Sequence, residues 1–291
     1  MKTRIVPESN YKSIWLPSGK TIRIAIDSNN PITELKHPEF YDIKLTEKCL
    51  GKCKWCYQNS NETDKHYENI TDKLRRFFGS MEKKDLPYQI AYGGGEPTEH
   101  PEFSEAMRIT KEEFDICPNY TTNGMWAIDE EKSKKIVETT KNYCGGVAIS
   151  THPHLNKYWK SAAKKFVENG VRLNFHVIIS DKKSIDRFIK IFNEWKDKVE
   201  YFVLLPYGNV GKAAENRKKI AWDYLVKVFP KEDASQIAFG ANFYPYLMKG
   251  ELDIKVSLYE PEIMSKYVDL KDDGYMYASS FSDKILKEKL F

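Results

Sequence analysis

The 291-residue sequence has no apolar run that approaches the roughly 20 residues needed to span a membrane. Its N-terminal segment also lacks an apolar run of signal-peptide length. Only five cysteines are present, and this odd number in a chain without a secretory signal argues against a disulfide framework. We therefore expect a cytoplasmic protein with no membrane association, whose thiols are available for metal binding or catalysis.

A strong excess of charge is also absent. The 46 basic and 42 acidic side chains leave a net charge of +4, and the basic clusters at residues 73–76 and 217–219 are short and close to acidic residues. Such clusters are typical of solvated helix faces, so we expect no nucleic-acid partner. With 41% hydrophobic and 13% aromatic residues, the composition is that of a globular protein with a real core.

Predicted strands and helices alternate along residues 41–228, which indicates an α/β fold. Strands are expected at residues 41–46, 88–93, 119–123, 147–151, 171–180 and 201–205. Helices are expected at residues 70–78, after Phe103, and at residues 130–143, 158–169, 185–195 and 222–228. Six strand-then-helix units in a row predict a parallel sheet joined by right-handed crossovers.

The strand at residues 171–180 favours an open barrel over a doubly wound sheet. One face carries Leu173, Phe175, Val177 and Ile179, and the other face is polar. Central strands of a doubly wound sheet are apolar on both faces, whereas a polar face suits a lumen that receives a substrate. We predict an incomplete (β/α)6 TIM-like barrel at residues 39–230. An N-terminal hairpin extension (1–38) would precede it, and a small irregular C-terminal region (231–291) would follow.

Three cysteines, Cys49, Cys53 and Cys56, form a C-x3-C-x2-C run after the first predicted strand of the barrel. Thiolates at this spacing can converge on one metal centre, and soft thiolates select zinc or iron–sulfur. Structural zinc normally takes four protein ligands, and a [4Fe–4S] cluster normally takes four cysteines. Three cysteine ligands would leave one iron of the cluster with an open coordination position, which a catalytic site requires. Zinc remains an alternative at this stage.

A glycine-rich loop, Tyr92-Gly93-Gly94-Gly95-Glu96-Pro97-Thr98, follows the second predicted strand of the barrel. Glycines at the end of a strand expose backbone groups to close approach by a ligand. The loop lacks the Lys-Ser/Thr of a phosphate-binding loop. Its carbonyl groups and Glu96 suit a ligand ammonium group better than a phosphate.

These two motifs, with the aromatic Tyr57 directly after the third cysteine, resemble the signature of the radical SAM enzymes. The resemblance covers about residues 38–215 and implies an incomplete (β/α)6 barrel, a [4Fe–4S] cluster and S-adenosylmethionine. In that family the fourth iron chelates the amino and carboxylate groups of S-adenosylmethionine, which is reductively cleaved to a 5′-deoxyadenosyl radical. The resemblance also implies an electron donor such as a flavodoxin or ferredoxin.

The resemblance assigns roles to individual residues. Cys49, Cys53 and Cys56 match the cluster ligands, Gly94, Gly95 and Glu96 match the segment that holds the methionyl ammonium, and Tyr57 matches the position whose backbone meets adenine. Strand-end positions that match further cofactor contacts are Asn123, Ser150, Pro206 and Gly208. Cys117 and Cys144 lack cluster spacing, and we interpret both as buried small hydrophobic residues.

The alternation of side chains along the strands, rather than the resemblance, predicts substrate-binding residues in the lumen. The polar candidates are Asp42, Lys44, His152, Arg172, Asn174 and His176. Polar side chains at the carboxyl ends of barrel strands usually contact the substrate. For each of them, an ion pair or hydrogen bond inside the lumen is the alternative.

Residues 267–281 weakly resemble the auxiliary-cluster (SPASM-like) module of peptide- and protein-modifying radical SAM enzymes. Ser279 stands where that module has a cysteine, and no cysteine follows Cys144, so auxiliary clusters are excluded. The likeness favours a peptide or protein substrate, although we expect the first 38 residues to be too short for a complete leader-binding domain. A glycyl-radical-enzyme activase, a small-molecule- or nucleoside-modifying enzyme, and a non-catalytic binding protein remain alternatives.

Overall fold

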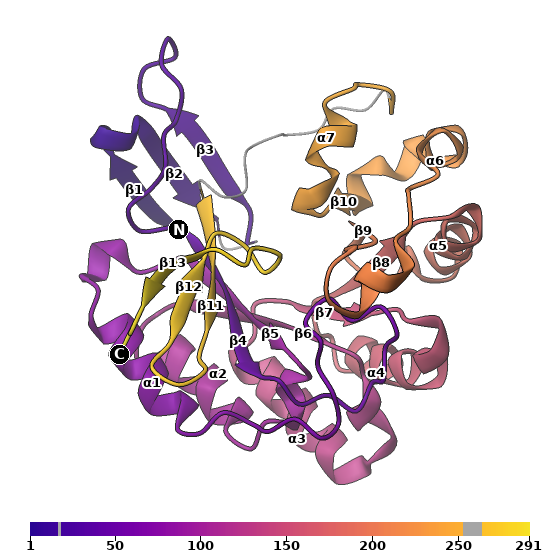
Figure 1. Cartoon of the computed structure of the whole chain (residues 1–291), viewed down its shortest axis with the longest axis horizontal. Helices are drawn as coiled ribbons and strands as arrows, with labels where there is room; N and C mark the ends of the chain where they lie inside the picture. Colours follow the sequence, from indigo (N-terminus) through magenta and orange to yellow (C-terminus); the bar gives the residue numbers. More distant parts are fainter. Residues whose placement is uncertain (17–18, 253–263) are drawn as a thin grey trace.

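The computed structural model describes residues 1–16, 19–252 and 264–291, and six parallel strands form its centre. In Figure 1 they form a curved wall with helices outside it. The strands are β4 (Phe40–Thr46), β5 (Gln89–Gly94), β6 (Cys117–Thr122), β7 (Val147–Ser150), β8 (Leu173–Ile179) and β9 (Tyr201–Pro206). Each pairs in parallel with the next, as the alternation of the sequence predicts.

A helix follows each of these strands, and its apolar face packs against the outside of the sheet. The helices are α1 (Ile70–Gly79), α2 (Phe103–Glu112), α3 (Glu130–Tyr143), α4 (Asn156–Glu168), α5 (Lys182–Trp195) and α6 (Trp222–Val228). In α5 the side chains of Ile185, Phe188 and Phe192 are buried at the helical spacing of three and four residues. These repeated amphipathic helices give the sheet a continuous outer core.

Strand β8 shows how the lumen arises. Leu173, Phe175 and Val177 are at most 1% exposed, while Asn174 and His176, which alternate with them, are only partly buried. Successive side chains of a strand point to opposite faces, so the apolar set meets the helices and the polar set faces the lumen. The expectation of one polar face is confirmed for this strand.

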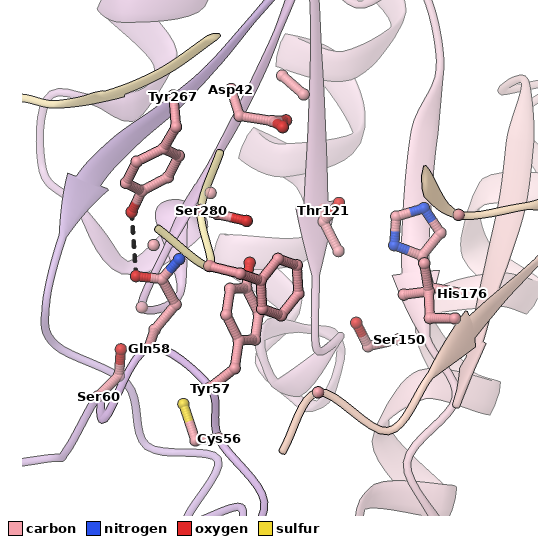
Figure 2. A pocket seen from close by; sticks show the side chains of 18 of the residues that line it. Asp42, Cys56, Tyr57, Gln58, Ser60, Thr121, Ser150, His176, Tyr267 and Ser280 are labelled. Atoms are coloured by element: carbon pink, nitrogen blue, oxygen red, sulfur yellow. Dashed lines mark hydrogen bonds between the residues drawn. The ribbon is translucent and has the colours of Figure 1, made fainter. Parts of the chain in front are cut away.

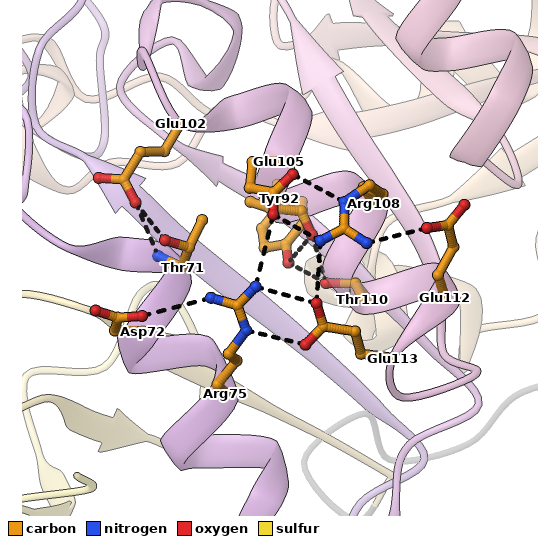
Figure 3. A network of polar contacts seen from close by, with 11 residues as sticks. Thr71, Asp72, Arg75, Tyr92, Glu102, Glu105, Arg108, Thr110, Glu112 and Glu113 are labelled. Atoms are coloured by element: carbon orange, nitrogen blue, oxygen red, sulfur yellow. Dashed lines mark hydrogen bonds and ion pairs between the residues drawn. The ribbon is translucent and has the colours of Figure 1, made fainter.

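Outside the sheet, α1 and α2 are joined by a network of ion pairs (Figure 3). Arg75 on α1 contacts Glu113 at 2.9 Å, and Arg108 on α2 contacts Glu105 at 2.7 Å. Their side chains are partly exposed, and pairs of this kind contribute about 0–1 kcal/mol each. The network therefore adds to helix packing but does not drive it.

The N-terminal segment is a three-stranded antiparallel sheet: β1 (Lys2–Val6), β2 (Tyr11–Trp15) and β3 (Thr21–Ala25). The predicted hairpin corresponds to β2 and β3, with residues 17–18 outside the described part. Glu39, just before β4, is 2% exposed and accepts hydrogen bonds from Tyr11 and Arg23. Because an unpaired buried carboxylate is costly, these bonds hold the small sheet against the start of the barrel.

The C-terminal region adds strands to both sides of the six-stranded core. On one side, β10 (Ile237–Phe239) pairs in parallel with β9. On the other, β11 (Ser265–Asp269) pairs in parallel with β4, and β12 (Tyr275–Tyr277) and β13 (Ile285–Glu288) continue the sheet antiparallel. The region also holds the short α7 (Tyr244–Leu247).

Within the described residues the ten-stranded sheet runs from β10 to β13 without closing. This open sheet agrees with the predicted incomplete barrel. The parallel pairing of β11 with β4 is a feature that the irregular sequence pattern did not indicate. The boundaries of the three predicted segments stay a prediction. None of the helices in the part of the chain that the structure describes is long and apolar enough to cross a membrane.

Candidate active site

A cavity of about 400 Å³ opens at the carboxyl ends of the barrel strands (Figure 2). The loop after β4, the ends of β5–β9, strand β11 and residues 278–281 all contribute to its wall. Carboxyl ends of parallel strands are the usual location of sites in barrels of this type. The cavity therefore lies where the sequence motifs predict a site.

The thiol groups of Cys49, Cys53 and Cys56 belong to residues that line this cavity. Burial, with the nearby Glu96 carboxylate, raises the pKa of Cys49 to about 12. Burial and the neighbouring Cys56 raise the pKa of Cys53 to about 12 as well. Without a positive charge these thiols stay protonated at neutral pH, which makes them poor free nucleophiles. A bound metal centre would supply that charge, so the donor set is suited to metal ligation.

Hydrogen bonds surround the sulfur atoms. The backbone N–H of Gly51 donates to Cys49 Sγ at 3.3 Å, and Asn123 Nδ2 donates to the same sulfur at 3.7 Å. His154 Nε2 lies 3.5 Å from Cys53 Sγ and 2.8 Å from the carbonyl oxygen of Gly51. Sequence reasoning missed His154, because it lies about a hundred residues from the cysteines and belongs to no motif.

The cysteine loop is attached to the segment that follows β9. Lys212 N–H donates to the carbonyl oxygen of Cys56 at 3.0 Å. A Cβ atom on Gly211 would lie 2.4 Å from the carbonyl oxygen of Tyr57, so only glycine allows this approach.

Among the described residues, no three His, Cys, Asp or Glu side chains are grouped closely enough to hold a single metal ion.

The glycine-rich loop packs directly on the start of the cysteine loop. The N–H of Gly95 donates to the carbonyl oxygen of Thr46 at 2.7 Å. The N–H of Glu96 donates to the carbonyl oxygen of Lys48 at 2.9 Å. A Cβ on Gly95 would lie 2.1 Å from Lys48 O, and Gly94 has a positive φ of 104°. Both glycines are thus required by the backbone, independently of any ligand.

Glu96 is 2% exposed and connects the ends of β5 and β6. Its Oε1 accepts from Thr98 Oγ1 at 2.5 Å and Thr122 Oγ1 at 2.8 Å, and its Oε2 accepts from Asn123 N at 2.7 Å. Burial raises the pKa of Glu96, and these hydrogen bonds oppose that rise. The carboxylate holds Asn123, and therefore the Asn123 contact to Cys49, in place.

Tyr57, predicted near adenine, and Gly208, predicted as a further cofactor contact, lie beside Phe281, which the sequence motifs did not indicate. The ring of Phe281 stacks on the ring of Tyr57 with centroids 4.7 Å apart and an angle of 25° between the planes. A Cβ on Gly208 would lie 3.1 Å from Phe281 Cε1. Ser150 and Pro206 also line the cavity, as does Ser279. The likeness to an auxiliary-cluster module pointed to this segment but not to its position in the cavity.

Three of the six lumen candidates, Asp42, His152 and His176, line the cavity. Asp42 is accessible from the cavity, yet the surrounding walls raise its pKa to about 7 by desolvation. Burial lowers the pKa of His176 to about 4, and burial with the neighbouring His154 lowers that of His152 to about 3. Both imidazoles are therefore neutral at neutral pH.

The other three candidates do not line the cavity, which corrects the expectation from strand alternation. Lys44 pairs with Asp269 on β11 at 3.0 Å, a partner that the unpredicted pairing of β11 with β4 supplies. Arg172 precedes β8, at its amino end, and pairs with Glu200 at 2.9 Å with 42% of its side chain exposed. Asn174 lies near Gly146 on the same amino side.

Cys117 and Cys144 also lie at the amino side of the sheet, away from the cavity wall. Both are partly rather than completely buried. Cys144 Sγ donates to the carbonyl oxygen of Gly146 at 3.2 Å. Neither cysteine joins the candidate site.

A partial parallel barrel with a three-cysteine loop and a glycine-rich loop at the carboxyl ends of its strands defines a class of enzyme. The family model described as the Radical SAM superfamily matches residues 43–203, which is more than half of the chain. The chain therefore belongs to the radical SAM superfamily. It is an enzyme of this class, and the enzymes of this superfamily use a [4Fe–4S] cluster and S-adenosylmethionine.

Solved structures support the fold. Streptococcus suis SuiB bound to the precursor peptide SuiA is 18% identical with a TM-score of 0.64, over 88% of this chain and 63% of SuiB. The structure of anSMEcpe with bound AdoMet and Cp18Cys peptide is 16% identical with a TM-score of 0.55, over 87% of this chain and 78% of anSMEcpe.

A curated relative is the 7,8-dihydro-6-hydroxymethylpterin dimethyltransferase of Methanocaldococcus jannaschii. It is 25% identical over 144 residues, which make up 47% of this chain and 28% of that protein. The chain thus spans less than a third of this relative and less than two thirds of SuiB.

Proposed function

We propose that the protein reductively cleaves S-adenosylmethionine and uses the resulting radical to abstract hydrogen from a peptide or protein. The observation that carries this proposal is the convergence of three cysteines and the Gly-Gly-Glu-Pro loop on one cavity of a partial barrel. When bound, a [4Fe–4S] cluster supplies one electron to the sulfonium of S-adenosylmethionine, which yields a 5′-deoxyadenosyl radical.

In this proposal Cys49, Cys53 and Cys56 hold the cluster and leave one iron without a protein ligand. The neighbouring loop would support the ligand through its backbone, and Gly94 and Gly95 fix the position of that loop because they let it pack against Thr46 and Lys48. Tyr57, Pro206 and Gly208 flank adenine, and Asn123 and Ser150 supply polar contacts. Enclosure by the barrel limits the access of water to the radical.

A peptide or protein substrate is supported by two solved structures with a similar fold, those of SuiB with SuiA and anSMEcpe with a peptide. The similarity to a pterin dimethyltransferase over 144 residues favours a small-molecule substrate as the second candidate. A flavodoxin or ferredoxin electron donor and a cytoplasmic location stay predictions.

The test is anaerobic formation of 5′-deoxyadenosine by the full chain with a rebuilt cluster, S-adenosylmethionine and a strong reductant. Mass spectrometry should find the product with the wild type and not with the Cys49/Cys53/Cys56→Ala variant, whose iron content should also be lost. Equal amounts of 5′-deoxyadenosine from both proteins would contradict the proposal. A wild type that holds zinc instead of iron and sulfide would do the same.

A further inference from the structure

The described side chains that line the cavity include carboxyl groups but no group that is positively charged at neutral pH. In the described part of the chain, its lining includes the carboxyl groups of Asp42 and Glu96 but no lysine or arginine. His152 and His176 are neutral for the reasons given above. An anionic substrate group would therefore meet no compensating charge on this wall.

The two carboxyl groups differ in their surroundings. Glu96 accepts hydrogen bonds on both oxygens from Thr98, Thr122 and Asn123. Asp42 has neither a hydrogen bond nor an ion pair with any described residue, and desolvation alone raises its pKa to about 7. Asp42 is exposed to the cavity that it lines, so this unpaired carboxyl group is accessible to a partner from outside the chain.

The positions of its neighbours leave Asp42 open to the lumen. Asp42 pairs in register with Ala91 on β5 and Tyr267 on β11. The Ala91 side chain is short, and the Tyr267 hydroxyl donates to Gln58 Oε1 at 3.0 Å rather than to Asp42. Figure 2 shows Asp42 and His176 on opposite sides of the cavity with Thr121 between them.

Asp42 lies away from the cysteine and glycine loops along β4. It lies four residues before Thr46, at the carboxyl end of β4, where the glycine-rich loop is attached. At about 3.3 Å per residue, this separation is about 13 Å along the strand. The carboxyl group thus faces a deeper part of the lumen than the cysteine and glycine loops.

We propose that Asp42 is a substrate-binding residue, and that the substrate presents a cationic side chain, an amine or a guanidinium, to this carboxylate. This inference rests on the proposed function and specifies the chemistry of its substrate. The incoming cation pairs with the carboxylate that Asp42 exposes in the cavity, and an opposite charge nearby favours the ionised form of a carboxyl group. The neutral imidazole of His176 offers a hydrogen-bond acceptor on the facing wall.

The first experiment measures binding without turnover. The full chain, with cluster and S-adenosylmethionine but no reductant, is titrated calorimetrically at pH 8 with acetyl-Gly-X-Gly-amide peptides, in which X is lysine, norleucine or glutamate. We expect the lysine peptide to bind about 10- to 100-fold more tightly than the norleucine peptide, the range of a hydrogen bond to a charged group. Norleucine keeps the same aliphatic stem, so the comparison isolates the charge.

Asp42→Asn should abolish the preference for lysine and leave the affinity for S-adenosylmethionine unchanged. Asp72→Asn, at a side chain on α1 that is 67% exposed, is the matched control and should keep the preference. A wild type without preference for the lysine peptide overturns the inference. Weaker binding of S-adenosylmethionine by Asp42→Asn also overturns it, because Asp42 would then belong to the cofactor site.

A second readout separates this inference from the proposed function. With reductant, side-chain-deuterated lysine peptide should transfer deuterium to 5′-deoxyadenosine, and deuterated norleucine peptide should transfer about 10- to 100-fold less. If no 5′-deoxyadenosine forms at all, the proposed function fails while the binding data still decide the role of Asp42. If deuterium comes equally from both peptides, the role of Asp42 fails while the radical chemistry stands.

Discussion

The two sides of the cavity are built in different ways. The proposed cofactor side comes from two short loops, residues 49–57 and 93–96, and the second loop hydrogen bonds through its backbone to Thr46 and Lys48, just before the first. The opposite side combines side chains from β4, β8 and β11 with the distant residues 278–281. A site made of local backbone leaves a motif in the sequence, whereas a site assembled from separate strands does not.

The difference also concerns chemistry. On the cofactor side, glycines allow close backbone approach, and the buried Glu96 is satisfied by its own chain. On the other side, Asp42 has no partner among the described residues, and the imidazole of His176 is kept neutral. The carboxyl group on the cofactor side therefore has its hydrogen bonds without a substrate, whereas the carboxyl group on the opposite side has none. Substitutions on the two sides should therefore differ in kind and in size, and the largest effect is expected on the cofactor side.

Gly95→Ala should damage the cofactor side most. The new Cβ would lie 2.1 Å from Lys48 O, which is backbone and cannot move aside cheaply. Overpacking of this kind costs about 1–3 kcal/mol, and more where the backbone must shift. We expect a loss of about 3 kcal/mol in the free energy of unfolding, measured by denaturant titration, with a marked loss of affinity for S-adenosylmethionine.

Gly93→Ala is the control for this variant. Gly93 lies in β5, two residues before Gly95 in the same glycine-rich segment, and a Cβ added there would have nothing within 4 Å. Its free energy of unfolding should change by less than about 0.5 kcal/mol, as at unconstrained sites. Similar losses for the two variants would show that the approach of Gly95 to Lys48 is not what requires glycine.

Phe281→Ala tests where the two sides meet. Phe281 stacks on the ring of Tyr57 and lies beside Gly208, the two residues that we propose to flank adenine, so we expect its ring to move aside when S-adenosylmethionine binds. An aromatic stack contributes about 0.5–1.5 kcal/mol, so its removal should tighten binding by about 2- to 10-fold. Equilibrium dialysis under anaerobic conditions measures this. Weaker binding would instead make Phe281 part of the adenine site.

Much of the fold could be predicted because its signals are local. The amphipathic helices and the alternation of Leu173, Phe175 and Val177 with polar residues depend on neighbours a few positions apart. The pairing of β11 with β4 could not be predicted, because it joins residues more than 200 positions apart. The predicted lumen role of Lys44 failed for the same reason, since its partner Asp269 lies on β11.

Asp42→Asn should change the pH dependence of stability. The pKa of Asp42 is raised from 3.8 to about 7 in the folded state, so the folded chain holds this proton more tightly than the unfolded chain does. Stability of the wild type should therefore fall as the pH rises from about 4 through 7. The neighbouring groups that titrate, Tyr57 and Tyr267, have raised pKa values and stay neutral in this range.

Asparagine does not titrate, so the Asp42→Asn variant should not lose stability in this way as the pH rises. The difference in melting temperature, variant minus wild type, should be near zero below about pH 4, grow up to about pH 7 and then level off. Thermal unfolding of both proteins across this range measures it. A difference that is constant with pH would show that the carboxyl group of Asp42 is not desolvated by the walls of the lumen.

Arg172→Ala should have the smallest effect, although Arg172 and His176 share a strand face in the sequence pattern. Arg172 pairs with Glu200 at the amino end of β8, and both side chains are about two-fifths exposed. Such a pair contributes about 0–1 kcal/mol, so denaturant titration should detect at most a small loss of stability. His176→Gln, four residues further into the lumen, should weaken binding of the lysine peptide, while Arg172→Ala should leave it unchanged. If Arg172→Ala weakened peptide binding as much as His176→Gln does, the substrate site would extend to the amino end of the barrel, and the contrast between its two sides would have to include the whole lumen.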